Sequence, residues 1–467
     1  MSSSCRSPLA KQVYGRFADL GSVAAGKRRD FCRLCSAIAL GAPIFLSPAL
    51  ARADNWELLP RIEFGGTYND NYRLANTPAQ ELQVYGPYLD AQLNMQLVSP
   101  TSKLEIVPRV RTDDYPTDHE DQSTDGFLNI GWDTKTLRSD FNGVATYANE
   151  TVIMSELLPA NFAGVALGQV VGGASGIVTF HDREQLAHVA PDYTYDFTQR
   201  THLNLQAAYD HASFSQSQIQ QVGYNNYMGQ AGILFNVSQL STLSLNGVGS
   251  RFVPQEGNGA TTTYGVNVEW DLVHSQIAHF YARLGDNRSR SDVTTTTTIT
   301  NPPVRRGAPP TVTTLTTSGT VTTNGVTGGV GMELRYQVTE VTLDFLRALS
   351  PSDVGAQVVH TEARFRVLHA FAPRFSGFLA VRGIRLRGSS DQVGLRITGE
   401  DYVAAESGVD YQITQSFRVE AKYDFMWQRF QGTPSASSNA VGLAIIYQPL
   451  SRYEPLPQFT GIPLQER

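Results

Sequence analysis

The sequence predicts an all-β protein: a single transmembrane antiparallel up-and-down β-barrel of about 18 strands, preceded by a cleaved N-terminal signal peptide. Three observations predict it. Apolar and polar residues alternate strictly in many segments, as in strands with a different solvent on each face. Very short polar links alternate with long loops along the chain. Only 17% of residues are charged while 10% are aromatic, which argues against disorder.

The first 53 of the 467 residues are expected to be the signal peptide. An apolar stretch, Leu34 to Leu50, follows a basic group and ends at Ala51-Arg52-Ala53, a small-x-small cleavage sequence. At about 17 residues with two prolines, this stretch is too short for a membrane anchor. The pair Arg28-Arg29 resembles a twin-arginine signal, so the general and twin-arginine export routes both stay open.

Removing residues 1–53 changes the charge and the cysteine content. This segment holds all 3 cysteines, 8 of the 37 Lys and Arg, and 2 of the 43 Asp and Glu. The mature chain therefore has 29 basic and 41 acidic residues, a net charge of −12, and no cysteine. Without a basic stripe, nucleic acid is excluded as a partner.

The alternating segments give the strands in order. The clearest is 416–430, where Phe417, Val419, Ala421, Tyr423, Phe425 and Trp427 alternate with polar and charged residues. The full set of expected strands is 61–73, 84–98, 102–111, 125–134, 137–149, 185–197, 200–212, 224–237, 241–253, 262–273, 276–287, 326–337, 340–349, 357–370, 374–386, 400–412, 416–430 and 438–448. An even number with strands of about ten residues or more is typical of a barrel crossing a bilayer. A soluble β-protein is the alternative.

The connections alternate in length. Links such as 198–200, 238–240 and 414–416 are very short, whereas the long loops lie at 112–124, 150–184, 254–261, 287–325 and 387–399. Short turns on one side and long loops on the other are typical of outer-membrane barrels. The Thr-rich segment 287–325 is expected to be a mobile low-complexity loop. The barrel is expected to occupy 54–448, followed by a periplasmic tail, 449–467.

Three segments resemble a known family. The hairpin between Arg183 and Phe214, the segment Gly66 to Asn71 and the segment Arg347 to Gly355 are similar to those of outer-membrane β-barrel porins associated with exopolysaccharide or surface-polymer loci. The resemblance covers essentially the whole mature chain, as a pattern of hairpins rather than a set of active-site residues. It implies location in the cell outer membrane, contact with its lipid and insertion by the barrel assembly machinery. The tail after Tyr447 departs from the family, whose barrels often end on an aromatic residue.

On strands where charged residues alternate with apolar ones, the charged side chains are expected to line a water-filled lumen. Contact with lipid at mid-membrane would cost about 2–4 kcal/mol for each basic residue. The charged residues are Glu362, Arg364, Arg366, Arg418, Glu420, Lys422 and Asp424. The alternative is a lumen closed by ion pairs. A ring of about 18 strands is too wide for side chains alone to fill, which favours a channel unless a loop plugs it.

Two long loops have unusual compositions. The apolar loop 150–184 is expected to fold into the barrel as a constriction, with Leu157, Leu158, Phe162, Val165, Leu167, Val170 and Val171, or else to form an outer lid or subunit contact. An acidic outer loop contains Asp113, Asp114, Asp118, Glu120 and Asp121. It is either a solvated loop that attracts cations or a Ca²⁺ site, although its spacing matches no known calcium loop.

The function predicted is a porin-like channel, for passive diffusion of hydrophilic solutes or for export of a surface polysaccharide. A structural or adhesive barrel and a barrel-embedded hydrolase are the alternatives. Asp210-His211 would suit a catalytic base, but no nucleophile accompanies it, and the nine histidines show no metal spacing. No enzyme activity and no cofactor is therefore predicted, and self-association into a homo-oligomer stays open.

Overall fold

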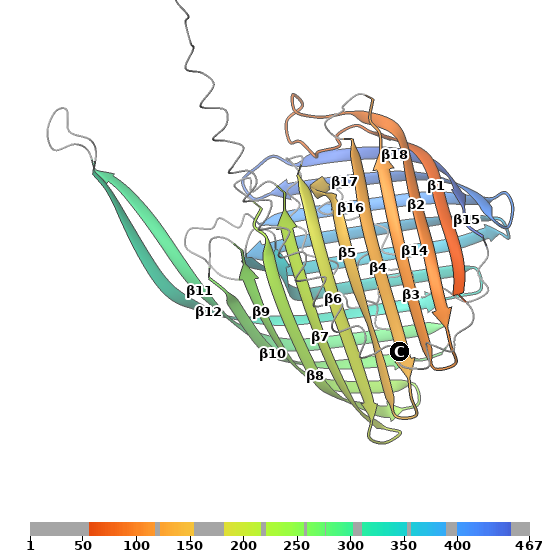
Figure 1. The fold of residues 1–467 in the computed structure, drawn as a ribbon, viewed down its shortest axis with the longest axis horizontal. Helices are drawn as coiled ribbons and strands as arrows, with labels where there is room; N and C mark the ends of the chain where they lie inside the picture. Colours follow the sequence, from red (N-terminus) through yellow and green to blue (C-terminus); the bar gives the residue numbers. More distant parts are fainter. Residues whose placement is uncertain are drawn as a thin grey trace, which may run out of the picture. The chain divides into compact units, whose positions relative to one another are not determined.

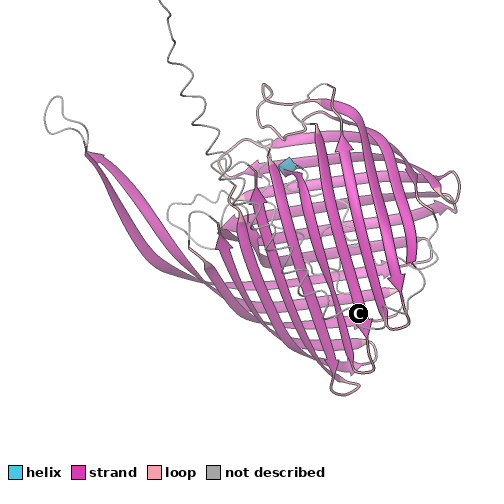
Figure 2. Cartoon of the chain, in the orientation of Figure 1, coloured by secondary structure: helices cyan, strands magenta, loops and turns pink. Residues whose placement is uncertain are grey.

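The computed structural model describes residues 56–116, 122–153, 182–215, 221–255, 259–275, 277–301, 311–352, 356–388 and 399–449. The expected signal peptide and nearly all of the expected tail lie outside these residues. The strands are β1 (Trp56–Asn69), β2 (Val84–Val98), β3 (Ser102–Asp113), β4 (Ser123–Lys135), β5 (Ser139–Thr151), β6 (Arg183–Asp196), β7 (Thr201–Phe214), β8 (Tyr224–Ser238), β9 (Ser241–Pro254), β10 (Thr261–Val273), β11 (Ala278–Asn301), β12 (Thr311–Arg335), β13 (Thr339–Ser352), β14 (Ala356–Ala372), β15 (Phe375–Gly388), β16 (Glu400–Gln412), β17 (Phe417–Phe430) and β18 (Ala436–Tyr447). Figure 2 shows this nearly pure β content.

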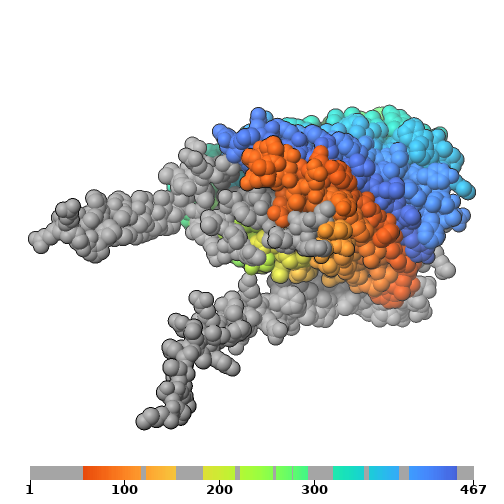
Figure 3. Space-filling view, turned by 90° about the horizontal axis from the view of Figure 1, so that it is seen from above, coloured from red at the N-terminus to blue at the C-terminus, as the bar shows by residue number. Residues whose placement is uncertain are grey.

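The strands form one closed ring. Each pairs with the next in the chain, and β1 also pairs antiparallel with β18, where Gly65 lies opposite Ala444. Figure 3 shows the N-terminal strands, in orange, beside the C-terminal strands, in blue. Closure leaves no edge at the seam, which a sheet in a bilayer requires. The predicted 18-stranded antiparallel up-and-down barrel is confirmed.

Alternation along each strand separates two faces. On β17, Phe417 and Tyr423 are exposed on the outer face, whereas Gln428 is buried on the inner one. The same period makes the outer face of the ring apolar. Its exposed side chains include Leu58, Phe64, Leu89, Ile233, Leu245, Val268, Trp270, Leu284, Val330, Phe345, Leu379, Leu443 and Ile445. Such a continuous apolar surface far exceeds what a soluble monomer carries.

Residues 287–301 and 311–325 are strands, not the loop that their composition predicted. β11 and β12 pair from Ala278↔Leu334 to Asn301↔Thr311 as a long hairpin, and the intervening residues 302–310 lie outside the described residues. The many threonines are β-branched and suit an extended, paired backbone. β12 pairs with β13 only from Gly328 onward, so the hairpin projects beyond the ring (Figure 1).

No helix among the described residues is long and apolar enough to span a membrane.

Candidate channel lumen

The inward faces of the strands divide the lumen into two walls of different charge. On the described inward positions of β5–β10 there is no Lys or Arg. Apart from histidines, every charged side chain at these positions is acidic. These are Asp140, Glu150, Glu184, Asp192, Asp196, Asp210, Glu269 and Asp271. On the other side, β14, β15, β17, β1 and β3 carry Arg364, Arg366, Arg382, Arg418, Lys422, Arg61, Lys103, Arg109 and Arg111, interleaved with acids. The inward basic residues of the described strands therefore all lie outside β5–β10.

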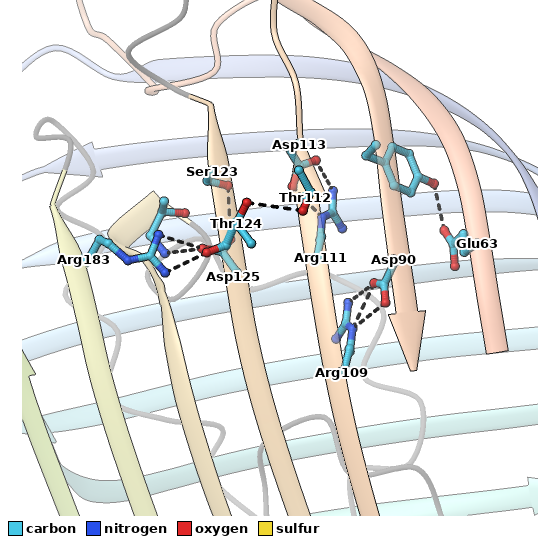
Figure 4. A network of polar contacts seen from close by, with 12 residues as sticks. Glu63, Asp90, Arg109, Arg111, Thr112, Asp113, Ser123, Thr124, Asp125 and Arg183 are labelled. Atoms are coloured by element: carbon cyan, nitrogen blue, oxygen red, sulfur yellow. Dashed lines mark hydrogen bonds and ion pairs between the residues drawn. The ribbon is translucent and has the colours of Figure 1, made fainter. Parts of the chain in front are cut away.

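Two inward arginines of β3 are fixed by contacts with neighbouring side chains (Figure 4). Arg109 donates from Nε to Asp90 on β2 at 2.9 Å, and Arg111 donates from Nε to Asp113 at 2.8 Å. Their guanidinium groups lie over rings, Arg109 5.0 Å from the Phe127 centroid and Arg111 4.8 Å from that of Tyr88. These contacts fix both side chains, since paired and stacked guanidinium groups lose rotamer freedom.

The exposure within the Asp90–Arg109 pair is unequal. The Arg109 side chain is 32% exposed, whereas that of Asp90 is 4% exposed. On the inward face the guanidinium is therefore the accessible member of the pair, and the carboxylate is covered. The Arg109 guanidinium is thus a partly exposed cation on the inward face of β3, although the Asp90 carboxylate balances its formal charge.

The second candidate group lies at the long-loop end of β4 (Figure 4). The carboxylate of Asp125 accepts a hydrogen bond from the backbone N–H of Thr151 at 3.1 Å and lies 3.3 Å from Nη1 of Arg183. Arg183 also donates to the backbone carbonyls of Thr124 and Asn149. These bonds tie β4, β5 and β6 together where the chain leaves β5. Asp125 was missed as a member of this group because its partners are remote in sequence.

The predicted acidic loop is only partly described. Asp113 pairs with Arg111 inside β3, and Asp114 accepts a hydrogen bond from the Gln122 side chain at 2.6 Å. Asp118, Glu120 and Asp121 lie outside the described residues. The described part of the chain contains no group of three His, Cys, Asp or Glu placed to hold a metal ion.

The sheet register places Glu362 and Arg364 on the inward face of β14, where both side chains are buried. Glu362 accepts from Nε of Arg382 at 2.6 Å and lies 3.0 Å from Nε2 of His360, while Arg364 pairs closely with Asp344. Arg364 and Arg382 are only 2% and 1% exposed. This buried network matches the alternative of ion pairs that fill part of the lumen. Its members on β13 and β15 were missed because cross-strand register, not local pattern, brings them together.

The remaining predicted lumen residues are partly exposed. Arg366 donates to Glu340 at 2.8 Å, and Nζ of Lys422 lies 3.8 Å from Asp424. Arg418, Glu420, Lys422 and Asp424 share the inward face of β17. Gly442 lies opposite Lys422, and a Cβ there would approach the lysine Cγ to 3.2 Å. Glycine thus leaves room for the lysine stem. Lining of a water-filled pore by these residues stays a prediction.

The long-loop end of the lumen holds an apolar cluster. Leu74, between β1 and β2, and Ile153, just after β5, are buried in one cluster with Val358, Ile384 and Tyr402 of β14–β16. β5 and β14–β16 belong to different sides of the ring, so these two side chains narrow the interior. The predicted constriction residues Leu157, Leu158, Phe162, Val165, Leu167, Val170 and Val171 lie outside the described residues, and their role stays a prediction.

Asp210 and His211 do not form a catalytic pair. Asp210 faces inward, where it contacts Nδ1 of His188 at 2.5 Å and accepts from the amide of Asn226 at 2.9 Å. His211 is the next residue on the strand and points to the other face, where Nδ1 lies 2.9 Å from Asn225. Alternation along β7 separates the two side chains.

Comparison with known proteins gives similarity only at the level of structure. No family model matches the chain, and no curated protein matches it. Among solved structures, the chain is similar to OccK2 (OpdF) of Pseudomonas aeruginosa, with a TM-score of 0.42, 10% identity, and coverage of 85% of this chain and 98% of that one. It is also similar to the outer membrane protein OpdK of Pseudomonas aeruginosa, with a TM-score of 0.42, 9% identity, and coverage of 84% and 99%. A third is the outer membrane channel DcaP of Acinetobacter baumannii, with a TM-score of 0.39, 12% identity, and coverage of 84% and 97%.

Proposed function

We propose that the protein is a passive channel of the bacterial outer membrane through which small hydrophilic solutes diffuse. The observation that carries this is the reversal of polarity across one closed sheet. The outer face is apolar, whereas the inner face carries partly exposed charges such as Arg109 and Lys422. A soluble barrel would have the opposite arrangement, with the apolar face inside.

The height of the apolar surface supports location in a bilayer. On β17 the outward residues from Phe417 to Trp427 are all apolar or aromatic. This run extends about 34 Å along the strand, or about 24 Å along the membrane normal at a tilt of about 45°. The outward apolar band of outer-membrane barrels is about 25 Å tall. Outer-membrane lipid and the barrel assembly machinery are accordingly the proposed partners, and no enzymatic role is proposed.

The interior favours small solutes over a polymer. Leu74 and Ile153 narrow the long-loop end, and the network around Glu362 closes part of one wall. A hydrated polysaccharide needs a wide continuous path, so its export is the less favoured form of this function. The facing acidic and mixed walls would orient dipolar or zwitterionic solutes.

Planar-bilayer recordings test the proposal. The purified protein should give discrete ohmic conductance steps, and liposomes that contain it should swell in small sugars but not in dextran. Heat-modifiable migration in detergent should accompany both results, because closed barrels resist unfolding. A folded, inserted barrel without conductance would instead favour the structural or adhesive role. Swelling in dextran would favour the polymer-export form.

A further inference from the structure

Three arginines gather on the outer face of the barrel around a single aspartate. Asp401 of β16 accepts from Nε of Arg385 at 2.8 Å, from Nη2 of Arg387 at 3.0 Å and from Nη2 of Arg429 at 2.9 Å. Asp401 lies directly opposite Arg385 on β15 and Arg429 on β17 in the sheet register. We call Arg385, Arg387, Arg429 and Asp401 the arginine rim.

The rim carries a surplus of positive charge that is open to solvent. The side chains of Arg385, Arg387 and Arg429 are 62%, 43% and 53% exposed, whereas that of Asp401 is 16% exposed. Three guanidinium groups around one carboxylate leave a formal charge of +2. Each guanidinium has five N–H donors, and one carboxylate accepts only a few of them. Arg387 also donates from Nη1 to the backbone carbonyls of Leu386 and Glu400. Asp401 and these two carbonyls together still accept only part of the donors of the three guanidinium groups.

The position of the rim limits what binds it. Arg429 is the outward residue directly after Trp427, and its guanidinium lies 5.6 Å from that ring centroid. Trp427 ends the apolar band, and aromatic residues mark the boundary between hydrocarbon and headgroups. The rim is at the long-loop end of β15–β17, opposite the short-turn end. It thus lies at headgroup height on one leaflet.

We infer that the arginine rim binds the phosphate groups of a phosphorylated glycolipid, the lipid A part of lipopolysaccharide, in the outer leaflet. This inference rests on the proposed outer-membrane location. Guanidinium forks match phosphate oxygens in pairs, and a lipid phosphate at this height completes donors that the single carboxylate leaves open. The outward positions at the same end of β1–β4 offer no such chemistry. They are Tyr68, Tyr85, Thr112 and Thr124.

The test measures binding of lipid A to the purified full-length barrel in neutral detergent by native mass spectrometry. The triple variant Arg385→Ala, Arg387→Ala and Arg429→Ala should bind lipid A at least about tenfold more weakly than wild type, since each arginine contributes to attraction by anionic lipid. The matched control is Arg138→Ala, Arg200→Ala and Arg374→Ala. These arginines are exposed in short turns at the other end of the barrel, so the charge change is equal. The control should bind as wild type does.

Two further probes identify the group recognised. Lipid A treated with phosphatase should bind wild type as weakly as intact lipid A binds the triple variant. Inorganic phosphate should fail to displace lipid A at equal concentration. Equal binding of the dephosphorylated lipid, full displacement by phosphate, or an equal loss in the control variant would each overturn the inference. Conductance is recorded in parallel, so a wild-type barrel that conducts but ignores lipid A refutes the rim and leaves the channel intact.

Discussion

Thr263 on β10 donates a hydrogen bond from Oγ1 to Oε1 of Gln357 on β14 at 2.9 Å, although 94 residues separate them. Both side chains are buried, and Ser289 of β11 also contacts Thr263 at 2.8 Å. Since β10 and β14 are not neighbours in the ring, this bond draws two parts of the wall together near the long-loop end. The ring is therefore narrowed where the β11–β12 hairpin leaves it, because β10 and β14 approach each other there. We call this narrowing the pinch.

The substitution Gln357→Ala should weaken the contact between β10 and β14 at this pinch. The lost hydrogen bond should lower the free energy of unfolding by about 1 kcal/mol, and single-channel conductance should rise. Urea unfolding in lipid vesicles and planar-bilayer recording measure the two effects. Gln92→Ala, on the inward face of β2, is the control and should leave conductance nearer to that of wild type. A conductance unchanged in Gln357→Ala would show that the pinch does not limit the current.

The two faces of β17 should respond differently to one arginine. Ala421→Arg places a charge on the outward face in mid-strand and should destabilise the barrel by about 2–4 kcal/mol. Lys422→Arg keeps a charge on the inward face and should be nearly neutral. Unfolding in vesicles of both variants makes the comparison. Similar losses at the two positions would contradict the register of β17.

The buried network should be sensitive to loss of its central carboxylate. Glu362→Gln removes the negative charge beside Arg382 and Arg364 and should cost about 3–5 kcal/mol, as expected when one partner of a buried ion pair is lost. Asp424→Asn removes a partly exposed charge beside Lys422 and should cost at most about 1 kcal/mol. Chemical denaturation of the two variants gives the difference. An equally small loss in Glu362→Gln would mean that water reaches this wall.

The loop after β5 should limit the pore. Ile153, just after the end of β5, is buried in the apolar cluster that also contains Leu74. Deletion of residues 160–176 is expected to raise conductance and admit larger sugars in liposome swelling. Deletion of residues 303–309, which lie in the sequence between β11 and β12, is the control and should leave conductance unchanged. If the first deletion folds and conducts as wild type, the loop does not constrict the pore.

Local periodicity was enough to predict the number of strands and the outward face of strands such as β17. Phe417, Tyr423 and Lys422 occupy alternate positions of one segment, and the backbone of an extended strand directs such positions to opposite sides. A sheet in a bilayer must leave no unpaired strand edge exposed to lipid and must keep its apolar residues outside, so the same pattern also predicted closure of the ring. The sequence by itself therefore determined the fold class and the polarity of each face.

Only the tertiary structure decided which charges meet. Glu362 and Arg382 lie on different strands, and their contact depends on a register that no local pattern shows. The segment 293–301 has the composition of a loop, yet pairing with β12 extends it as a strand. On β15, Arg382 is buried whereas Arg385 is exposed beside Asp401, although the two arginines are three residues apart in one run of arginine and apolar residues. A strand has two sets of alternate positions, and alternation alone does not determine which set faces lipid when both contain arginine. On β15 the pairing with neighbouring strands determines it.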